Sequence, residues 1–322
     1  MRERVPPADL SKVRTYPLAE RRNKVTVADF ARPVDPQASL AAFLDGLPAS
    51  LAAGTLRDLA AAVAEAADGA RTIVWAIGAH VIKVGLSPVL IGMMERGEIG
   101  ALALNGAGAI HDWEIAAIGA TSEDVAASLS LGRFGMAEET GREMSEAAAE
   151  AAAGEEGLGE ALGRRIVESG RPHAGSSLLA RAWDLGIPAT VHVAIGSDIV
   201  HQHPSADGAA IGAATHTDFR RLVSVVRGLA GGVWINCGSA VQLPEVFLKA
   251  LSVAENLGGR LPAFVTANLD MVRHYRTEEN VLRRPVLGRG RSFALVGHHE
   301  IQVPLLAAAV AIERGRRAAA KR

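Results

Sequence analysis

The sequence predicts an α/β protein built on a doubly wound, mostly parallel sheet. Six short apolar runs alternate with helical segments from one end of the chain to the other. Most of these runs are apolar throughout rather than at every second residue, which is the pattern of strands buried on both faces of a parallel sheet. Alternating strand and helix patterns are typical of such a sheet with helices on both sides.

The first expected strand covers residues 72–78, where an apolar run ends in a glycine. The other expected strands are 99–104, 189–195, 232–236, 262–268 and 292–297. Apolar residues at helical spacing predict helices within 37–69 and near 88–96, 138–150, 160–169, 177–185, 217–229, 244–257 and 304–314. Ser87 is expected to cap the second of these, and Gly315 to end the last, before a frayed tail. Residues 271–290 are expected to form a charged loop.

The chain is expected to contain one domain. Residues 1–36 are polar and carry five prolines, so they are predicted to form an N-terminal arm that packs on the surface or on a partner subunit. Residues 37–322 show no internal repeat and no linker. We therefore predict a single α/β domain over 37–322.

The composition excludes several classes of partner. The chain has 34 Lys and Arg against 35 Asp and Glu, and only 4% of its residues are aromatic. It therefore lacks the basic footprint of a protein that binds nucleic acid or an anionic membrane. It has one cysteine, no apolar leader and no apolar run long enough to span a membrane. We expect a cytoplasmic protein that acts on a small molecule.

The segment Gly196–Gly208 gathers more reactive side chains than any other. It follows the strand expected at 189–195 and contains Asp198, His201, His203 and Asp207. The two imidazoles, two residues apart, can share one side of an extended segment. They could act as general acid and base, or bind a divalent metal together with the acids. A polar loop whose imidazoles cap backbone groups remains an alternative.

Two glycine turns follow expected strands and could hold a phosphate. Asn105, Gly106 and Gly108 come after residues 99–104, and Cys237, Gly238 and Ser239 come after residues 232–236. Glycine lets the backbone N–H groups approach a phosphate closely at the start of a helix. A tight turn without a ligand would show the same residues, and Cys237 could simply be a small core residue.

Three further positions carry weaker signals. Lys83 follows the first strand and is placed to bind phosphate or form a Schiff base, although a surface lysine is the simpler alternative. Asp112 opens a helix, where it could bind a ribose or an amine or only interact with the helix dipole. His298, His299 and Glu300 follow the last strand, and a structural role is the default interpretation.

Four segments resemble the deoxyhypusine synthase family within residues 70–312. They are Asn105–Gly108, Ile195–Asp198, Asn236–Ser239 and Thr266–Asn268. The resemblance implies a Rossmann-type sheet, a homotetramer and NAD as cofactor, with sites at subunit interfaces. It also implies that Gly196, Ser197, Thr266 and Asn268 lie near the cofactor, together with the two glycine turns.

The sequence departs from that family where its chemistry is decided. The family's nucleophilic lysine has no counterpart, because residues 280–285 read Asn-Val-Leu-Arg-Arg-Pro. An arginine stays protonated and cannot form the imine that lysine forms. We therefore expect an NAD-dependent enzyme that oxidises a small amine or alcohol and then transfers or eliminates a group. The alternatives are a metal-assisted hydrolase or lyase that uses His201, His203 and Asp207, and a non-catalytic metabolite-binding subunit.

Overall fold

A computed structural model describes residues 5–322 and shows one six-stranded sheet. Its strands are β1 (Ile73–Ile77), β2 (Ala101–Asn105), β3 (Ala189–His192), β4 (Val233–Cys237), β5 (Val265–Asp270) and β6 (Arg291–Val296). They lie in the order β3-β2-β1-β4-β5-β6, and every neighbouring pair is parallel. This order is that of the Rossmann fold, so the predicted doubly wound α/β class is confirmed.

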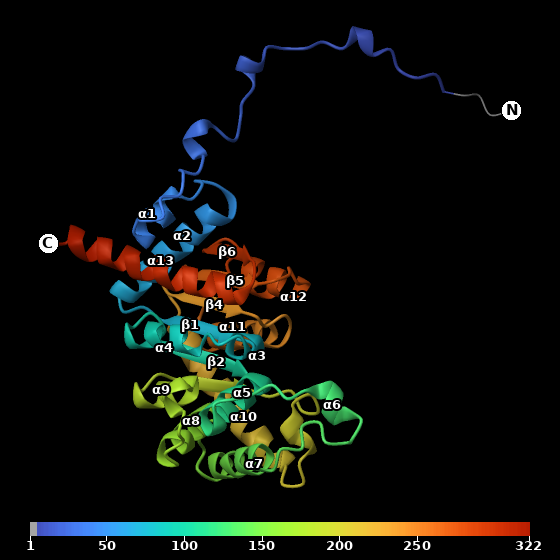
Figure 1. Cartoon of the computed structure of the whole chain (residues 1–322), viewed down its shortest axis with the longest axis vertical. Coiled ribbons are helices and arrows are strands. Elements are labelled where there is room, and N and C mark those ends of the chain that lie inside the picture. The colour runs from blue at the N-terminus through green and yellow to red at the C-terminus, as the bar shows by residue number, and fades with distance from the viewer. Residues whose placement is uncertain (1–4) are drawn as a thin grey trace.

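Helices cover both faces of the sheet (Figure 1). One face packs against α2 (Leu51–Asp68), α4 (Ser87–Glu95), α5 (Gly106–Ile118), α8 (Leu158–Glu168), α9 (Leu178–Asp184) and α13 (His299–Ala320). The other face packs against α11 (Gln242–Gly258), the second half of α10 (Gly208–Arg227) and a π-helix, Glu278–Arg283. Burial on both sides explains why the central strands are apolar throughout.

The remaining helices lie around this core. They are α1 (Leu40–Gly46), α3 (Ala79–Lys83), α6 (Val125–Leu129), α7 (Glu138–Ala153) and α12 (Tyr275–Thr277).

In residues 5–322, no helix is both long and apolar enough to cross a membrane. The five residues of β1 are all buried, as are those of β4. The centre of the sheet therefore gives a rigid base for the loops at its carboxyl edge.

Side chains of α10 form hydrogen bonds with the backbone groups on the free edge of strand β3. The Asp218 carboxylate accepts a hydrogen bond from the Val191 N–H at 2.8 Å. The Thr215 hydroxyl donates to the Val191 carbonyl at 2.8 Å and accepts from the Val193 N–H at 3.1 Å. An unpaired strand edge invites pairing with another chain, and these contacts block it on this side of the sheet.

Several expected boundaries were wrong. Leu86 rather than Ser87 precedes α4, and the buried Ser87 hydroxyl has no hydrogen-bond partner. Residues 275–283 are helical instead of a loop. Helix α13 starts at His299 and continues through Gly315 to Ala320, because Arg314 and Arg317 pair with Asp68 and hold the final turns against α2.

Residues 5–28 are all exposed, and Figure 1 shows them running away from the domain. The segment first contacts the domain through two backbone hydrogen bonds. The Ala49 N–H donates to the Asp29 carbonyl, and the Arg32 N–H donates to the Gly46 carbonyl. Of the expected arm at 1–36, residues 5–28 therefore extend from the domain, residues 29–32 contact it, and residues 1–4 lie outside the described residues.

Candidate functional site

The strand-end segments meet at one edge of the sheet, as expected from the parallel order. His192 of β3 lies opposite Asn105 of β2, and Cys237 of β4 lies between Ile77 of β1 and Leu269 of β5. Ligands of open α/β sheets bind at the carboxyl ends of the strands, where the strand order reverses. In this sheet the order reverses between β1 and β4, so these two strand ends define the candidate site.

Two glycines face each other at this reversal. The Gly78 N–H donates to the Cys237 carbonyl at 2.8 Å, which extends the β1–β4 ladder by one residue. A Cβ atom on Gly78 would overlap the Gly238 carbonyl oxygen. Gly238 has a φ of +69°, which favours glycine, and its backbone turns away from the sheet there. Only glycine at position 78 allows the backbone segments at Gly78 and Gly238 to come this close.

Two histidines lie beside the glycine pair. His299, the first residue of α13, is 1% exposed, and its Nε2 lies 3.2 Å from the Leu269 carbonyl oxygen. Its Nδ1 is buried without a hydrogen-bond partner. His80, in α3 directly after β1, is half-buried, and the two ring centroids are 5.7 Å apart in an edge-on arrangement. From the sequence alone His299 was expected to have a structural role, because local patterns do not show that the start of α13 lies beside the end of β1.

Polar side chains line the β4 and β5 ends beside this pair. The Asn236 amide donates to the Ser239 carbonyl at 2.9 Å and to the Asn268 side-chain oxygen at 2.7 Å. The side-chain oxygen of Asn236 is buried without a partner. Thr266, expected near the cofactor, is instead the second residue of β5, toward the amino end of the strand, and its hydroxyl is also buried without a partner. Burial, and secondarily the nearby Asp270 carboxylate, raises the pKa of the Cys237 thiol. Cys237 is therefore held as a neutral thiol and lines the site as an apolar group.

The turn after β2 is closed by its own side chains. The Asn105 side-chain oxygen accepts from the Gly108 N–H at 2.8 Å, which caps the start of α5. A Cβ atom on Gly106 would overlap the Asp198 carboxylate, so Asp198 lies directly over the same helix start. Asp198 is 8% exposed, its Oδ2 has no partner, and burial raises the pKa of its carboxyl.

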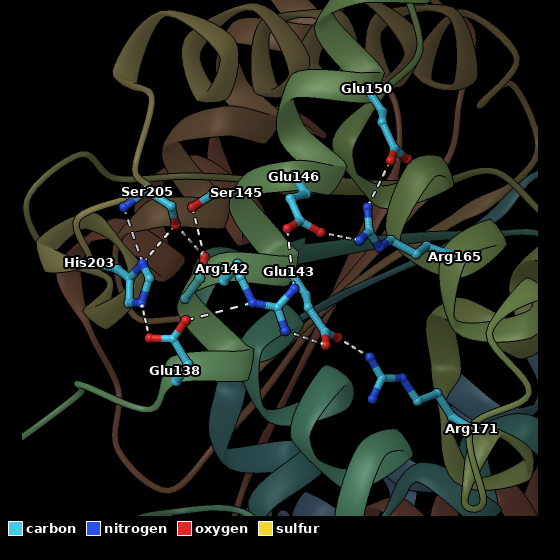
Figure 2. A network of polar contacts seen from close by, with 11 residues as sticks. Glu138, Arg142, Glu143, Ser145, Glu146, Glu150, Arg165, Arg171, His203 and Ser205 are labelled. Carbon is cyan, nitrogen blue, oxygen red and sulfur yellow. Dashed lines mark hydrogen bonds and ion pairs between the residues drawn. The ribbon is translucent and has the colours of Figure 1, made fainter.

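The segment 196–208 divides between three places instead of forming one cluster. Ile199–Gln202 is a 3-10 turn, not the expected extended segment, so the two imidazoles point apart. His201 Nδ1 accepts from the Gly196 N–H at 3.2 Å. His203 packs on α7, where its Nε2 lies 3.3 Å from a Glu138 oxygen and its Nδ1 lies 2.7 Å from the Ser205 hydroxyl (Figure 2). Ser197, beside this turn, is exposed.

Asp207 and Asp112 both accept hydrogen bonds at helix starts, although Asp112 itself lies in the middle of α5 and does not open that helix as expected. Asp207 accepts from the N–H groups of Ala209 and Ala210 and so caps α10. Asp112 is fully buried and accepts from the Ser177 hydroxyl at 2.5 Å and the Leu178 N–H at 2.7 Å at the start of α9. Burial raises the pKa of Asp112 to about 6 against these hydrogen bonds. These contacts occupy both carboxylates away from the glycine pair.

Lys83 lies at the end of α3 and is exposed. Burial, and secondarily the positive charge of Lys83, lowers the pKa of His111 on the neighbouring α5 to about 4. His111 Nδ1 is 2.6 Å from the Thr121 hydroxyl, which donates to Glu114 at 2.5 Å. Lys83 therefore belongs to a polar group between α3 and α5, one turn beyond His80.

Within residues 5–322, no three or more His, Cys, Asp or Glu side chains come close enough to hold a metal ion. The expected alternative of a metal site on His201, His203 and Asp207 therefore gains no support from the geometry. A cavity of about 660 Å³ lies at the opposite, amino edge of the sheet, where it is lined by residues such as Gly232 and Arg289. A cavity of only about 20 Å³ lies between Asp198, His201 and α7.

Comparison with known proteins supports the fold. No family model and no curated protein matches the sequence. Among solved structures, AgrE in complex with ornithine and NAD+ matches with a TM-score of 0.51 and 14% identity, over 82% of this chain and 33% of that chain. A conserved putative LOR/SDH protein from Methanococcus maripaludis S2 matches with a TM-score of 0.50 and 15% identity, over 82% of this chain and 70% of that one.

The chain thus spans about a third of the length of AgrE. A putative deoxyhypusine synthase from Entamoeba histolytica matches over 88% of this chain and 96% of that one, with a TM-score of 0.49 and 9% identity. Similarity at that level carries no argument about family. The two matches at 0.50 and above establish a Rossmann-like α/β fold and nothing finer.

Proposed function

We propose that the chain is an NAD-dependent enzyme that oxidises a small amine or alcohol. The observation that carries this proposal is the glycine pair Gly78 and Gly238 at the order reversal of a 3-2-1-4-5-6 sheet. In sheets of this order a dinucleotide lies across the reversal, and glycine in the first turn lets the backbone approach the pyrophosphate. AgrE, of which about a third matches this chain, was crystallised in complex with NAD+, and this supports the choice of cofactor.

The residues at the edge suit such a cofactor. Gly78 and Gly238 would line the pyrophosphate, with Ser239 at the start of the following turn. Asn105 ends β2, where dinucleotide-binding sheets place the residue that contacts the adenosine ribose. The partnerless oxygen of Asn236 and the partnerless Nδ1 of His299 are buried polar atoms at the same edge. Such atoms are costly unless a ligand or a water satisfies them.

The substrate class follows from charge and from the chemistry that NAD+ supplies. NAD+ accepts a hydride, so an ammonium R2CH–NH3+ becomes the iminium R2C=NH2+ and gives one proton to the protein. Asp270 and Asp198 are acids at the carboxyl edge and would attract a cationic amine. AgrE was crystallised with ornithine, an amine, as well as with NAD+. We therefore place small amines ahead of alcohols.

The absence of a lysine at 280–285 argues against an imine to the protein. In this proposal the oxidised substrate eliminates or transfers its group without a covalent bond to the chain. A relationship to the deoxyhypusine synthase family, the roles of Asp198, His201 and Lys83 in catalysis, and a homotetramer all remain part of the proposal. Each is supported by the sequence resemblance or by strand-end position alone.

The proposal is tested by NADH binding. Trp75 in β1 and Trp234 in β4 are buried in the two strands that end at the proposed cofactor site. Bound NADH should therefore quench tryptophan emission and emit by energy transfer. Turnover is then sought as NAD+ reduction with ornithine and other small amines. Binding without turnover would favour the non-catalytic alternative, whereas no NADH binding, and no nucleotide released from the purified protein by acid, would overturn the proposal.

A further inference from the structure

The His80–His299 pair is the feature of the candidate site that the cofactor leaves unexplained. His299 is fixed from two sides: its Nε2 faces the Leu269 carbonyl at 3.2 Å, and its Cε1 would lie 3.1 Å from a Cβ on Gly238. Because a carbonyl only accepts, Nε2 must carry the proton, and Nδ1 is an acceptor. That acceptor is buried and has no partner. His299 Nδ1 can therefore accept a hydrogen bond from a neighbouring donor.

The neighbouring ring is His80. Its centroid lies 5.7 Å from that of His299, with the ring planes at 61°, so one ring presents its edge to the other. His80 is half-buried, its ring lies beside that of His299, and it follows Gly78 of the proposed cofactor site by two residues. The Leu269 carbonyl thus fixes the buried His299 ring, and the His299 ring lies beside the more accessible His80 ring. In enzymes, a general base is commonly oriented in this way by a second group that hydrogen-bonds to it.

We propose that His80 accepts the proton released by the substrate and that His299 is a positioning residue, whose Nδ1 accepts a hydrogen bond from the protonated His80 ring. This inference rests on the function proposed above. The ammonium R2CH–NH3+ would lose one proton to a His80 ring nitrogen, and the resulting amine R2CH–NH2 would give its carbon-bound hydride to the NAD+ of the proposed function, which leaves the iminium R2C=NH2+. The other His80 nitrogen, which then also carries a proton, donates to His299 Nδ1. The proton later leaves His80 for solvent.

The surrounding charges are few. Lys83 lies on the same short helix, α3, as His80. His111 lies near Lys83 on α5, which packs against α3. Asp270 ends β5, and His298 and Glu300 flank His299 on α13. Of these, only Asp270 is both acidic and buried, with 7% exposure. Beside the His80 ring, His299 Nδ1 is a buried acceptor without a partner.

The test is histidine-ring NMR of the full chain without nucleotide. His299 is expected to be the Nε2–H tautomer, and an Nδ1–H tautomer would by itself overturn the inference. His299→Phe keeps a ring in the core but removes the acceptor, and should lower the midpoint of the His80 titration by about 0.5 to 1 unit. His299→Gln retains an acceptor and should restore part of the shift. His298→Gln, at the exposed neighbour, is the matched control.

A His80 midpoint that moves by less than about 0.2 unit in His299→Phe would contradict the inference. Should that variant fail to fold, the tautomer and the His299→Gln titration still decide the matter. Where ornithine or another amine is oxidised, His80→Gln should lower kcat about 100-fold and remove the acidic limb of the pH profile. NADH binding by all variants separates the two proposals: its absence overturns the function, whereas binding with an unchanged His80 titration overturns only the inference.

Discussion

Two glycines decide how close β1 and β4 come at the carboxyl edge. Gly78→Ala would place a methyl group on the Gly238 carbonyl oxygen, so one of the two backbones must move. We expect a loss of about 2 kcal/mol or more in the free energy of unfolding, together with weaker NADH binding. Gly212→Ala is the control, because this helical glycine of α10 has open space around it and should gain up to about 1 kcal/mol. Urea unfolding of both variants measures the difference, and equal stabilities would contradict the close approach.

Asp218 makes the stability of the protein depend on pH. Its carboxylate accepts from the Gly159 and Val191 N–H groups, but burial raises its pKa from 3.8 to about 7. The folded state therefore binds a proton more tightly than the unfolded state does. The stability due to Asp218 is complete below about pH 4 and is lost as the pH rises to 7, with a slope of up to about 1.4 kcal/mol per pH unit.

Asp218→Asn should flatten the dependence on pH between 4 and 7, because the amide cannot titrate. Unfolding free energies of the two proteins across this range measure the slope. The pKa of Asp112 is also raised, to about 6, so the comparison is made between wild type and variant and not on wild type alone. An unchanged slope in the variant would show that Asp218 is not the titrating group.

At the scale of elements, the α10 side chains should protect the β3 edge. Thr215→Val keeps the shape of the side chain but removes one donor and one acceptor that now satisfy β3. We expect a loss of about 1–3 kcal/mol and a greater tendency to self-associate through the freed edge. Thermal unfolding and light scattering measure the two effects. His216→Gln changes the exposed next residue as a control, and the same behaviour in both variants would contradict a capping role.

The sequence predicted the strands well, because a buried parallel strand is marked by its own composition. The runs at 72–78 and 232–236 contain β1 and β4 almost residue for residue. Helix ends were harder, because long-range contacts decide them. Nothing near Gly315 in the sequence indicates that Arg314 and Arg317 reach Asp68, 246 and 249 residues earlier, and keep α13 helical.

The sequence predicted where the candidate site lies on the sheet, but not which residues form it. The glycine turns and strand ends do share one edge, because parallel strands place them there. However, Asp112 and Asp207 cap helices, and His203 contacts α7, since a 3-10 turn rotates it away from His201. His80 and His299 are 219 positions apart (299 − 80), so only the sheet order brings them together.

At the scale of the whole molecule, the N-terminal arm exposes apolar side chains that its own domain does not cover. Residues 5–28 are exposed, including large apolar side chains such as Leu10, Val13 and Leu18. Apolar surface of this kind marks contact sites for another protein surface. We expect the chain to assemble, and removal of residues 1–36 to reduce the assembled mass. Light scattering measures both forms, and an identical number of subunits with and without the arm would contradict this role.

The central claim is that a dinucleotide binds where β1 and β4 part. Energy transfer from tryptophan to bound NADH, titrated for wild type, Gly78→Ala and Gly212→Ala, tests it most directly. The account predicts saturable binding by wild type and Gly212→Ala, and a Kd at least about tenfold higher for Gly78→Ala, equivalent to ~1.4 kcal/mol. Absence of NADH binding by folded wild type, or an unchanged Kd in folded Gly78→Ala, would contradict it.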